Sequence, residues 1–263
     1  GLLQAKNSTL ELAYSPENLR LGQAIECYLH PGHIVLGTAD AACEAKCVDL
    51  LGKLDGELMC MNLESAEAVK HGINSFLAAS IIFTNQLANV CEQTGASMAH
   101  VIAAMKADPR IGKRAYLEPG VGFSGGTLGR DLKVLQGHDD FFGDLWKRNN
   151  ERKNHIVKRV GQIFGPLEGL KLGVLGLTYK PGTSTLRRSV PLAIVEELQR
   201  AGVKVRAYDP RADYGELASA PTFEVVHSEA EAAEGADALL LLTAWPDFEK
   251  ADWAQIRDTM ARP

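Results

Sequence analysis

The sequence predicts an α/β protein in which a central helical region is followed by a Rossmann-like domain with a doubly wound parallel sheet. Between residue 40 and about residue 165 the apolar side chains recur mostly at helical spacing. After Gly165, short β-branched or leucine-rich runs alternate with helical runs, which is typical of parallel sheets covered by helices. With 263 residues, 46% of them hydrophobic, the chain is long enough for one large or two medium cores.

The first 37 residues predict the end of a sheet. STLELAYSPENLR, from residue 8, is expected to form a strand that runs into a proline-containing loop, and HIVLGT, from residue 33, a second strand. The start of this sheet is absent from the sequence, and the chain opens on Gly1 rather than methionine. Both features suggest a fragment of a longer protein.

The strongest helix is predicted over residues 65–94, with Gly95 as its stop signal. Its apolar residues recur mostly three and four positions apart and occupy more than one face. A helix of this kind needs several partners or a second copy of the chain to cover it. We therefore expect a homodimer.

Two sites in the middle region could carry chemistry. Lys70 and Asn74 lie one helical turn apart, where an amine and an amide could polarise a hydroxyl or hold an oxyanion, although both could simply be solvated. The stretch from Gly120 to Asp131 holds five glycines and leads into a helix. It suits close approach of a phosphate-rich or sugar ligand, or it is a flexible surface turn.

The last region is predicted to begin near residues 164–169. It contains the strand-like runs KLGVLGLTYKP, VKVRAYDP and DALLLLTAW, with a helix over residues 190–201. The glycines at 173 and 176 do not form a Gly-x-Gly-x-x-Gly turn, which disfavours NAD binding by this region. Asp209, at a strand end, could contact a ribose or could be a turn residue before Pro210.

Composition excludes several classes of function. The net charge of −5, with scattered lysines and arginines, indicates no nucleic-acid partner. No apolar stretch is long enough to span a membrane. Five cysteines without Cys-x-x-Cys spacing indicate reduced thiols and a cytoplasmic protein. Cys43 and Cys47 lie four apart on a helical segment, but no neighbours complete a set of ligands, so no metal site is expected.

Four segments, in order, resemble the UDP-glucose/GDP-mannose dehydrogenase family. SPENLRLGQAI resembles its PE-x-LR-x-G-x-A segment and AEAVKHGINSFLA its K-x-x-x-N helix. DPRIG with GVGFSGGTLGRDL resembles the glycine-rich catalytic loop, and GLTYKPGTSTLRRS resembles GL-x-[FY]-K-P-x-T-D-D-x-R-x-S. Together these matches cover nearly the whole chain and are specific.

The resemblance implies a three-part protein. Residues 1–37 would end an NAD-binding Rossmann domain that is otherwise almost wholly missing, residues 38–165 would form the helical dimerisation and catalytic region, and residues 166–263 would bind the nucleotide, UDP in a UDP-glucose-like substrate. The implied reaction oxidises a C6 hydroxyl to a carboxylate through an aldehyde and a cysteine thioester, with two hydride transfers to NAD, in polysaccharide precursor synthesis.

The resemblance also implies roles for single residues. Glu17 would handle protons and activate water, Lys70 and Asn74 would stabilise the alkoxide and oxyanion, and Asp131 would hold a water. Lys70, Asn74 and Asp131 would converge on the sugar carbinol. Arg110 would reach the substrate from the partner subunit and Tyr116 would contact the diphosphate. The remaining positions expected to bind substrate are Leu19, Phe123, Gly125 and Lys180, and those expected to bind NAD are Arg130 and Arg187.

Several positions depart from the family's motifs. Thr127 stands where the nucleophilic cysteine belongs, and a threonine hydroxyl needs a strong adjacent base to react. Leu21 replaces a glutamate that many relatives carry. Further changes that could reshape the sugar pocket are Ser124 for Gly, Gly129 and Arg130 for Pro-Lys, and Ser184 and Thr185 for Asp-Asp. We expect the first oxidation to survive and the second to be impaired; the alternative is a catalytically silent nucleotide-sugar-binding member.

Overall fold

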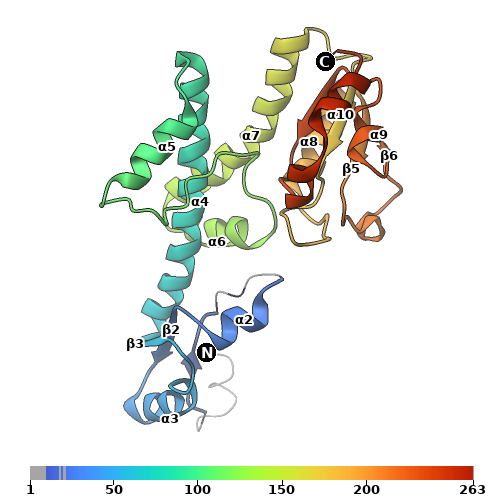
Figure 1. Ribbon diagram of the computed structural model, residues 1–263. Helices are drawn as coiled ribbons and strands as arrows, with labels where there is room; N and C mark the ends of the chain where they lie inside the picture. The colour runs from blue at the N-terminus through green and yellow to red at the C-terminus, as the bar shows by residue number, and fades with distance from the viewer. Residues whose placement is uncertain (1–9, 18, 20–21, 263) are drawn as a thin grey trace. The chain divides into compact units, whose positions relative to one another are not determined.

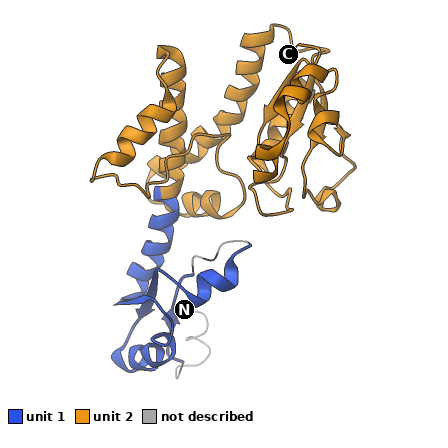
Figure 2. Cartoon of the chain, viewed as in Figure 1, with its two compact units in different colours: residues 1–76 blue, residues 77–263 orange. Residues whose placement is uncertain are grey.

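The chain divides into two compact units, residues 1–76 and residues 77–263, in a computed structural model that describes residues 10–17, 19 and 22–262 (Figure 2). The division falls inside one long helix. The boundaries predicted after residues 37 and 165 stay a prediction. Leu21, one of the departures from the family motif, lies outside the described residues.

The first unit is built around a three-stranded sheet in the order β1-β2-β3. β1 pairs antiparallel with β2, and β2 pairs parallel with β3 through the crossover helix α3. β2 is the centre of the core because Ile34, Val35 and Leu36 are buried. The elements of this unit are β1 (Ala13–Tyr14), α2 (Ala24–Leu29), β2 (His33–Thr38), α3 (Ala41–Leu51), β3 (Glu57–Met61) and the start of α4 (Leu63–Thr94).

β3 falls in the region that the sequence pattern predicts to be helical. Its residues, Glu57–Met61, include no β-branched or aromatic side chain, so local propensity carries no strand signal. Pairing with β2, in which His33 lies opposite Glu57, makes this segment a strand. Tertiary pairing therefore overrides propensity at this point.

The helical part of the second unit confirms the long predicted helix. α4 spans Leu63–Thr94 and ends directly before Gly95, as expected. A core cluster joins α4, α6, α7 and the loop before α6 through Ala78, Ile82, Phe123, Leu132 and Leu145. The other helices of this part are α5 (Met98–Ala107), α6 (Thr127–Gln136) and α7 (Asp140–Phe164). Within the described part of the chain, no helix is both long and apolar enough to cross a membrane.

The rest of the second unit is a four-stranded, all-parallel sheet in the order β6-β5-β4-β7, which confirms the predicted fold class (Figure 1). α8 packs on one face against Leu172 and Val174, and α9 approaches the other face at Gly173. The elements are β4 (Lys171–Leu175), α8 (Val190–Arg200), β5 (Lys204–Tyr208), η1 (Tyr214–Glu216), β6 (Glu224–Val225), α9 (Glu229–Ala233), β7 (Ala238–Leu241), η2 (Pro246–Lys250) and α10 (Trp253–Thr259).

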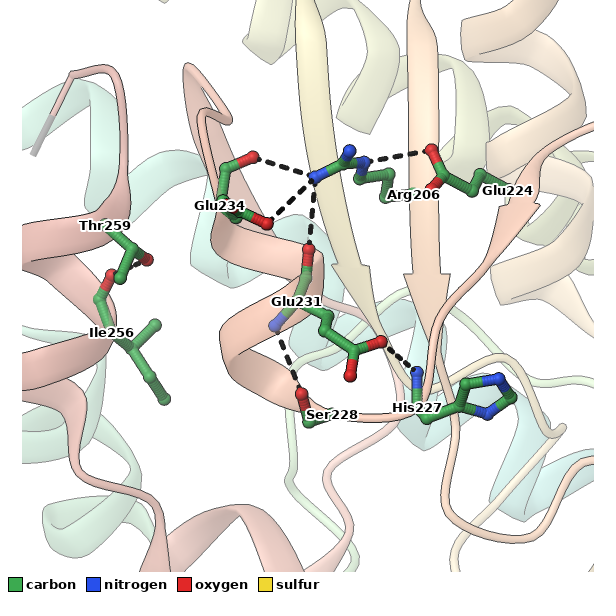
Figure 3. A network of polar contacts seen from close by, with 8 residues as sticks. All are labelled: Arg206, Glu224, His227, Ser228, Glu231, Glu234, Ile256 and Thr259. Carbon is green, nitrogen blue, oxygen red and sulfur yellow. Dashed lines mark hydrogen bonds and ion pairs between the residues drawn. The ribbon is translucent and has the colours of Figure 1, made fainter.

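Arg206 on β5 ties the edge strand β6 and the short helix α9 to the sheet (Figure 3). Its Nε donates to Glu224 Oε2 at 2.9 Å, and its Nη1 donates to the carbonyls of Glu231 and Glu234 at 3.4 and 3.1 Å. A cation at the end of a helix satisfies carbonyls that lack helical partners. At the other end, Ser228 Oγ accepts the N–H of Glu231, so both ends of this five-residue helix are capped.

Asp209 is a structural acid at the carboxyl end of β5. Its Oδ2 accepts the N–H groups of Leu177 and Thr178 at 2.7 and 2.9 Å, the Thr178 hydroxyl, and the indole N–H of Trp245. Its Oδ1 accepts the N–H of Arg211. The Asp209 carboxylate is buried, and both of its oxygens accept hydrogen bonds from the protein itself. Asp209 therefore acts as a turn residue and is not available to bind a ribose.

We predict that Asp209→Ala destabilises the protein by about 3 kcal/mol, because buried N–H donors lose their acceptor. The measurement is chemical denaturation followed by tryptophan fluorescence. The matched control is Asp213→Ala on the same loop, where an exposed carboxylate accepts one N–H, from Gly215, and we expect a loss below about 1 kcal/mol. Equal losses in the two variants would contradict the assignment.

Candidate functional site

The glycine-rich loop of residues 120–126 is fixed at its start by polar side chains of two helices. Gly120 donates its N–H to Asn85 Oδ1 on α4 at 2.8 Å, and its carbonyl accepts from Arg152 Nε on α7 at 2.9 Å. Arg152 also donates to Asn89 Oδ1 at 2.5 Å. Burial removes water from the Arg152 guanidinium and thereby lowers its pKa. The two oxygen acceptors, Gly120 O and Asn89 Oδ1, replace hydrogen bonds that water would otherwise make.

The middle of the loop is clamped by Asn149 on α7. Its Oδ1 accepts the N–H of Phe123 at 2.8 Å, and its Nδ2 donates to the Phe123 carbonyl at 2.9 Å. Asn149 is only 3% exposed. One amide side chain therefore satisfies both backbone groups of a buried loop residue, which makes this part of the loop rigid. The alternative of a flexible surface turn is wrong here.

The end of the loop is bound to the segment that precedes α8. Ser124 Oγ accepts the N–H of Val190 at 2.8 Å, and the Gly125 N–H donates to the carbonyl of Arg188 at 3.0 Å. Ser189 caps α8 by accepting the N–H of Leu192. Ser124 therefore has a structural role at a position where the family motif has glycine.

Thr127 is the first residue of α6 and is exposed. Asp131, one turn later, is buried, and Arg130 Nε lies 3.6 Å from its Oδ1. Gly126, the N-cap of α6, provides no side chain to cap the helix. A thiol at such a helix start would have a lowered pKa, but the threonine hydroxyl ionises far too weakly to gain in the same way.

Gly129 lies against the Trp146 ring, which leaves no room for a Cβ, whereas Gly126 lies against the end of the flexible Arg188 side chain. A Cβ on Gly126 would lie 1.9 Å from Arg188 Nη1, and a Cβ on Gly129 would lie 2.3 Å from the Trp146 ring. The change from the motif's proline to Gly129 therefore has a packing reason, since the indole of Trp146 occupies the space. At Gly126, the absence of a side chain lets the Arg188 guanidinium lie directly against the loop.

These parts enclose a cleft of about 540 Å³ in the second unit. Phe123 and Gly125, expected to bind substrate, and Arg130, expected to bind NAD, all line it. No aspartate or glutamate is among the lining residues, which are Phe123, Ser124, Gly125, Gly126, Gly129, Arg130, Lys133, Trp146, Asn149, Asn150, Lys153, Arg188, Ser189, Val190 and Ala193. Anions therefore suit this cleft.

Residues 120–125 also have Gly-x-Gly-x-x-Gly spacing, which is the spacing of dinucleotide-binding turns. A dinucleotide turn follows a strand, whereas this loop follows α5 and a connection without strands. The spacing alone therefore does not identify a Rossmann turn.

In the first unit, Lys70 and Glu17 are brought together. Lys70 Nζ donates to the main-chain carbonyl of Glu17, and the Glu17 carboxylate accepts the N–H of Leu19 at 2.6 Å. Asn74, one turn after Lys70, is 7% exposed, so the alternative of a solvated helix residue is wrong for this amide. Glu17 and Leu19 also line a cleft of about 420 Å³ within this unit.

Two predicted substrate residues lie on the connection between α5 and α6. The guanidinium of Arg110 is held by Asp108 at 2.6 Å, and this pairing lowers the pKa of the Asp108 carboxyl. The Arg110 side chain remains 87% exposed, as an arginine that reaches another molecule would be. Tyr116 is exposed as well, and burial of part of its ring raises its pKa.

Lys180 and Arg187 lie within the connection between β4 and α8. Lys180 Nζ lies 5.7 Å from the centre of the Tyr179 ring. Arg187 Nε lies 3.6 Å from Glu216 Oε1, so its guanidinium already has a carboxylate partner. Hydrogen bonds from Thr185 and Leu186 hold that carboxylate and lower the pKa of Glu216.

Lys70 and Asn74 belong to the first unit, whereas Asp131 belongs to the second. Their convergence on one sugar carbinol therefore stays a prediction. Within each unit the structure groups the expected residues, because Glu17 lies with Lys70, and Phe123 and Gly125 lie with Arg130.

Cys43 and Cys47 share α3 and are free thiols. Burial and the neighbouring Cys47 raise the pKa of the Cys43 thiol, which lowers its reactivity. Over residues 10–17, 19 and 22–262, no three His, Cys, Asp or Glu side chains gather in an arrangement that could hold a metal.

The residues that brace the loop were not predicted from sequence. Asn149 and Arg152 belong to the polar run KRNNERKNH, in which a buried Asn149 cannot be told from an exposed Asn150. Arg188 occupies a variable position of the resembling motif. The one sequence signal near Arg188 is Ser189, the next residue, which is a typical helix N-cap.

Comparisons with known proteins agree with this architecture. The model of the UDP-glucose/GDP-mannose dehydrogenase family's central domain matches residues 64–141, and the model of its UDP-binding domain matches residues 173–263. A solved UDP-glucose dehydrogenase from the hyperthermophilic archaeon Pyrobaculum islandicum is 26% identical, with a TM-score of 0.84 over 96% of this chain and 62% of that one.

Curated relatives cover the chain almost completely. UDP-glucose 6-dehydrogenases from Rickettsia bellii and Pseudomonas aeruginosa are each 32% identical over 99% and 98% of this chain. The chain spans 63% and 60% of their lengths. The chain therefore belongs to the UDP-glucose/GDP-mannose dehydrogenase family and carries its central and UDP-binding domains.

Proposed function

We propose that this chain is the larger part of an NAD-dependent enzyme that oxidises the C6 hydroxyl of a UDP-glucose-like nucleotide sugar, for the synthesis of polysaccharide precursors in the cytoplasm. The similarity to UDP-glucose 6-dehydrogenases supports this substrate class. The UDP-binding domain supports recognition of the nucleotide, with Lys180 as its phosphate contact.

The observation that carries the proposal is the contact between Lys70 and Glu17. The Glu17 carbonyl fixes the ammonium group at one end of α4, with Asn74 buried one turn away. A fixed cation beside an amide stabilises the negative charge that develops on a hydroxyl oxygen as it loses its proton. Glu17 would take part in moving that proton, and Asp131 would hold the water needed later.

NAD would accept the hydride. Of this chain's residues, Arg130 fits a contact with it, because its exposed guanidinium lines the anion-compatible cleft. Arg187 fits less well, since Glu216 already pairs with it. The C-terminal sheet does not fit NAD, because Asp209 is fully engaged inside the protein.

Thr127 should affect the two oxidations differently. The first needs only removal of a proton and a hydride, whereas the second passes through a covalent bond to the residue at this position. A hydroxyl at the start of α6 is a poor nucleophile without a base. We therefore propose an aldehyde-stage product; the second candidate is the silent binding member, which the absence of a thiol in this loop favours.

We predict that the full-length protein forms one NADH per sugar with its preferred UDP- or GDP-sugar, and that Thr127→Cys raises this ratio to two. The reason is that a thiolate at a helix start can carry the thioester. NADH absorbance and product analysis measure the ratio, with Thr127→Ser as the matched control. Two NADH per sugar in the unchanged protein would show that Thr127 is no obstacle, and none would favour the silent member.

Lys70→Ala should lower kcat by about 100-fold or more while nucleotide-sugar binding is retained, because the charge on the oxygen loses its stabilising cation. Steady-state kinetics and calorimetric titration measure the two quantities. Lys53→Ala, which removes an exposed lysine from the same unit, is the control. An unchanged function in Lys70→Ala is the result expected of a silent subunit.

We further propose a homodimer formed through α4. Phe83 and Val90, seven residues apart and therefore on one face, are 53% and 52% exposed. Large apolar side chains that repeat along one face indicate a covered surface. In a dimer, the exposed Arg110 could reach the partner's substrate.

Phe83→Glu combined with Val90→Glu should convert the dimer to a monomer, because two charges would be buried in an apolar interface. Size-exclusion chromatography with light scattering gives the mass. The control is Phe141→Glu, an equally exposed phenylalanine on α7. A dimer that survives the double change would exclude this face of α4 as the interface.

A further inference from the structure

We propose that a smaller cleft between α4 and α7 binds a small carboxylate that also carries hydroxyl groups. This cleft lies in the second unit, where the two helices diverge toward their C-terminal ends, and has a volume of about 230 Å³ (Figure 1). Its lining side chains come from residues 89–93 of α4 and 155–162 of α7. None of them lines the cleft of the glycine-rich loop, and all lie outside the four segments that resemble the family's motifs. The site is therefore separate from those proposed for substrate and NAD.

Every side chain that lines this cleft is an amide or a charged or titratable group. The amides are Asn89, Gln93 and Gln162, and each can both donate and accept hydrogen bonds. Nucleobases and lipids need apolar or aromatic walls, and no such side chain lines this cleft. Its volume also lies below the range of about 300–1,000 Å³ that is typical of sites for drug-sized ligands. These properties favour a polar ligand about the size of a monosaccharide.

The charges in the cleft favour a ligand with a single negative charge. Among the residues that the structure describes, no carboxylate lies at ion-pair distance from Lys158. Glu92 Oε2 lies 3.9 Å from both Arg159 Nε and His155 Nε2. Burial and the nearby Arg152 lower the pKa of His155, so its imidazole is neutral at pH 7. Two cations and one carboxylate therefore leave the cleft with a net charge of +1.

The carboxylate of Glu92 distinguishes this cleft from a phosphate site. A phosphate monoester carries a charge of about −1.5 to −2 at pH 7, and Glu92 would repel it. A ligand carboxylate carries one charge, which the ammonium group of Lys158 and the guanidinium of Arg159 can bind. The 3.9 Å separation of Glu92 from Arg159 exceeds hydrogen-bond distance, so both groups can still bond to a ligand. Glu92 and the amides would accept hydrogen bonds from the ligand's hydroxyl groups.

One wall of the cleft is fixed before any ligand binds. Asn89 Oδ1 accepts a hydrogen bond from Arg152 Nη1 at 2.5 Å, and Arg152 Nε donates to the carbonyl of Gly120 at 2.9 Å. Because Arg152 is buried, these contacts hold the Asn89 amide in one orientation. A hydrogen bond from Asn89 Nδ2 to a ligand would then cost little ordering entropy. The same arginine thus braces the glycine-rich loop on one side and this cleft on the other.

The test is calorimetric titration of the purified chain with D-glucuronate, a monosaccharide-sized carboxylate with hydroxyl groups, at constant ionic strength. D-Glucose tests the hydroxyl groups alone, acetate tests the charge alone, and inorganic phosphate tests a more highly charged anion. We expect each of these three to bind at least about tenfold more weakly than glucuronate. If any of them binds as tightly as glucuronate, the assignment of the ligand class is wrong.

Charge-reversal variants locate the site. Lys158→Glu and Arg159→Glu should each weaken glucuronate binding by about tenfold or more, because each removes a cation that binds the carboxylate. Lys147→Glu, the same charge change on α7 outside both clefts of this unit, should leave the affinity within about twofold. All three side chains are exposed, so the variants should fold, which circular dichroism verifies.

Titration in saturating UDP separates this site from the proposed function. UDP would occupy the nucleotide-sugar site, so glucuronate should bind equally well in its presence and in Lys180→Ala, whether or not the chain oxidises a sugar. Three results would overturn the proposal: no glucuronate binding to the unchanged protein at about 10 mM, displacement of glucuronate by UDP, or full binding in both Lys158→Glu and Arg159→Glu.

Discussion

The hydrogen bonds from α7 to the glycine-rich loop are the interactions on which the second unit's site depends. A loop rich in glycine has a large conformational entropy to lose, and its backbone groups need partners once they leave water. Asn149 and Arg152 provide those partners at Phe123 and Gly120. Because both side chains come from one rigid helix, the loop has a single geometry from which α6 begins.

The same loop joins the helical region to the sheet domain. Ser124 and Gly125 bond to the segment just before α8, and α8 packs on the sheet that ends in the network around Asp209. A position that differs from the family motif, Ser124, therefore makes one of the contacts that hold the two parts together. The site is positioned by both the helical core and the parallel sheet.

The departures from the motif have different physical consequences. Gly129 is compensated by Trp146, which fills the space beside the glycine. Thr127 has no such compensation, since an exposed hydroxyl at a helix start is chemically unlike a thiolate. Of these two changes, Gly129 is accommodated by packing, whereas Thr127 changes the chemistry available at the start of α6.

The sequence by itself determined the fold class, the long helix ending before Gly95, the parallel sheet and the family, because periodicity and motif spacing are local properties of the chain. Only the tertiary structure decided that Glu57–Met61 is a strand, that Asp209 is structural, and that Asn149 is buried while Asn150 is exposed. The charged cleft likewise depends on side chains such as Lys133 and Arg188, which are far apart in sequence. These outcomes rest on partners distant in the chain, and local patterns carry no information about them.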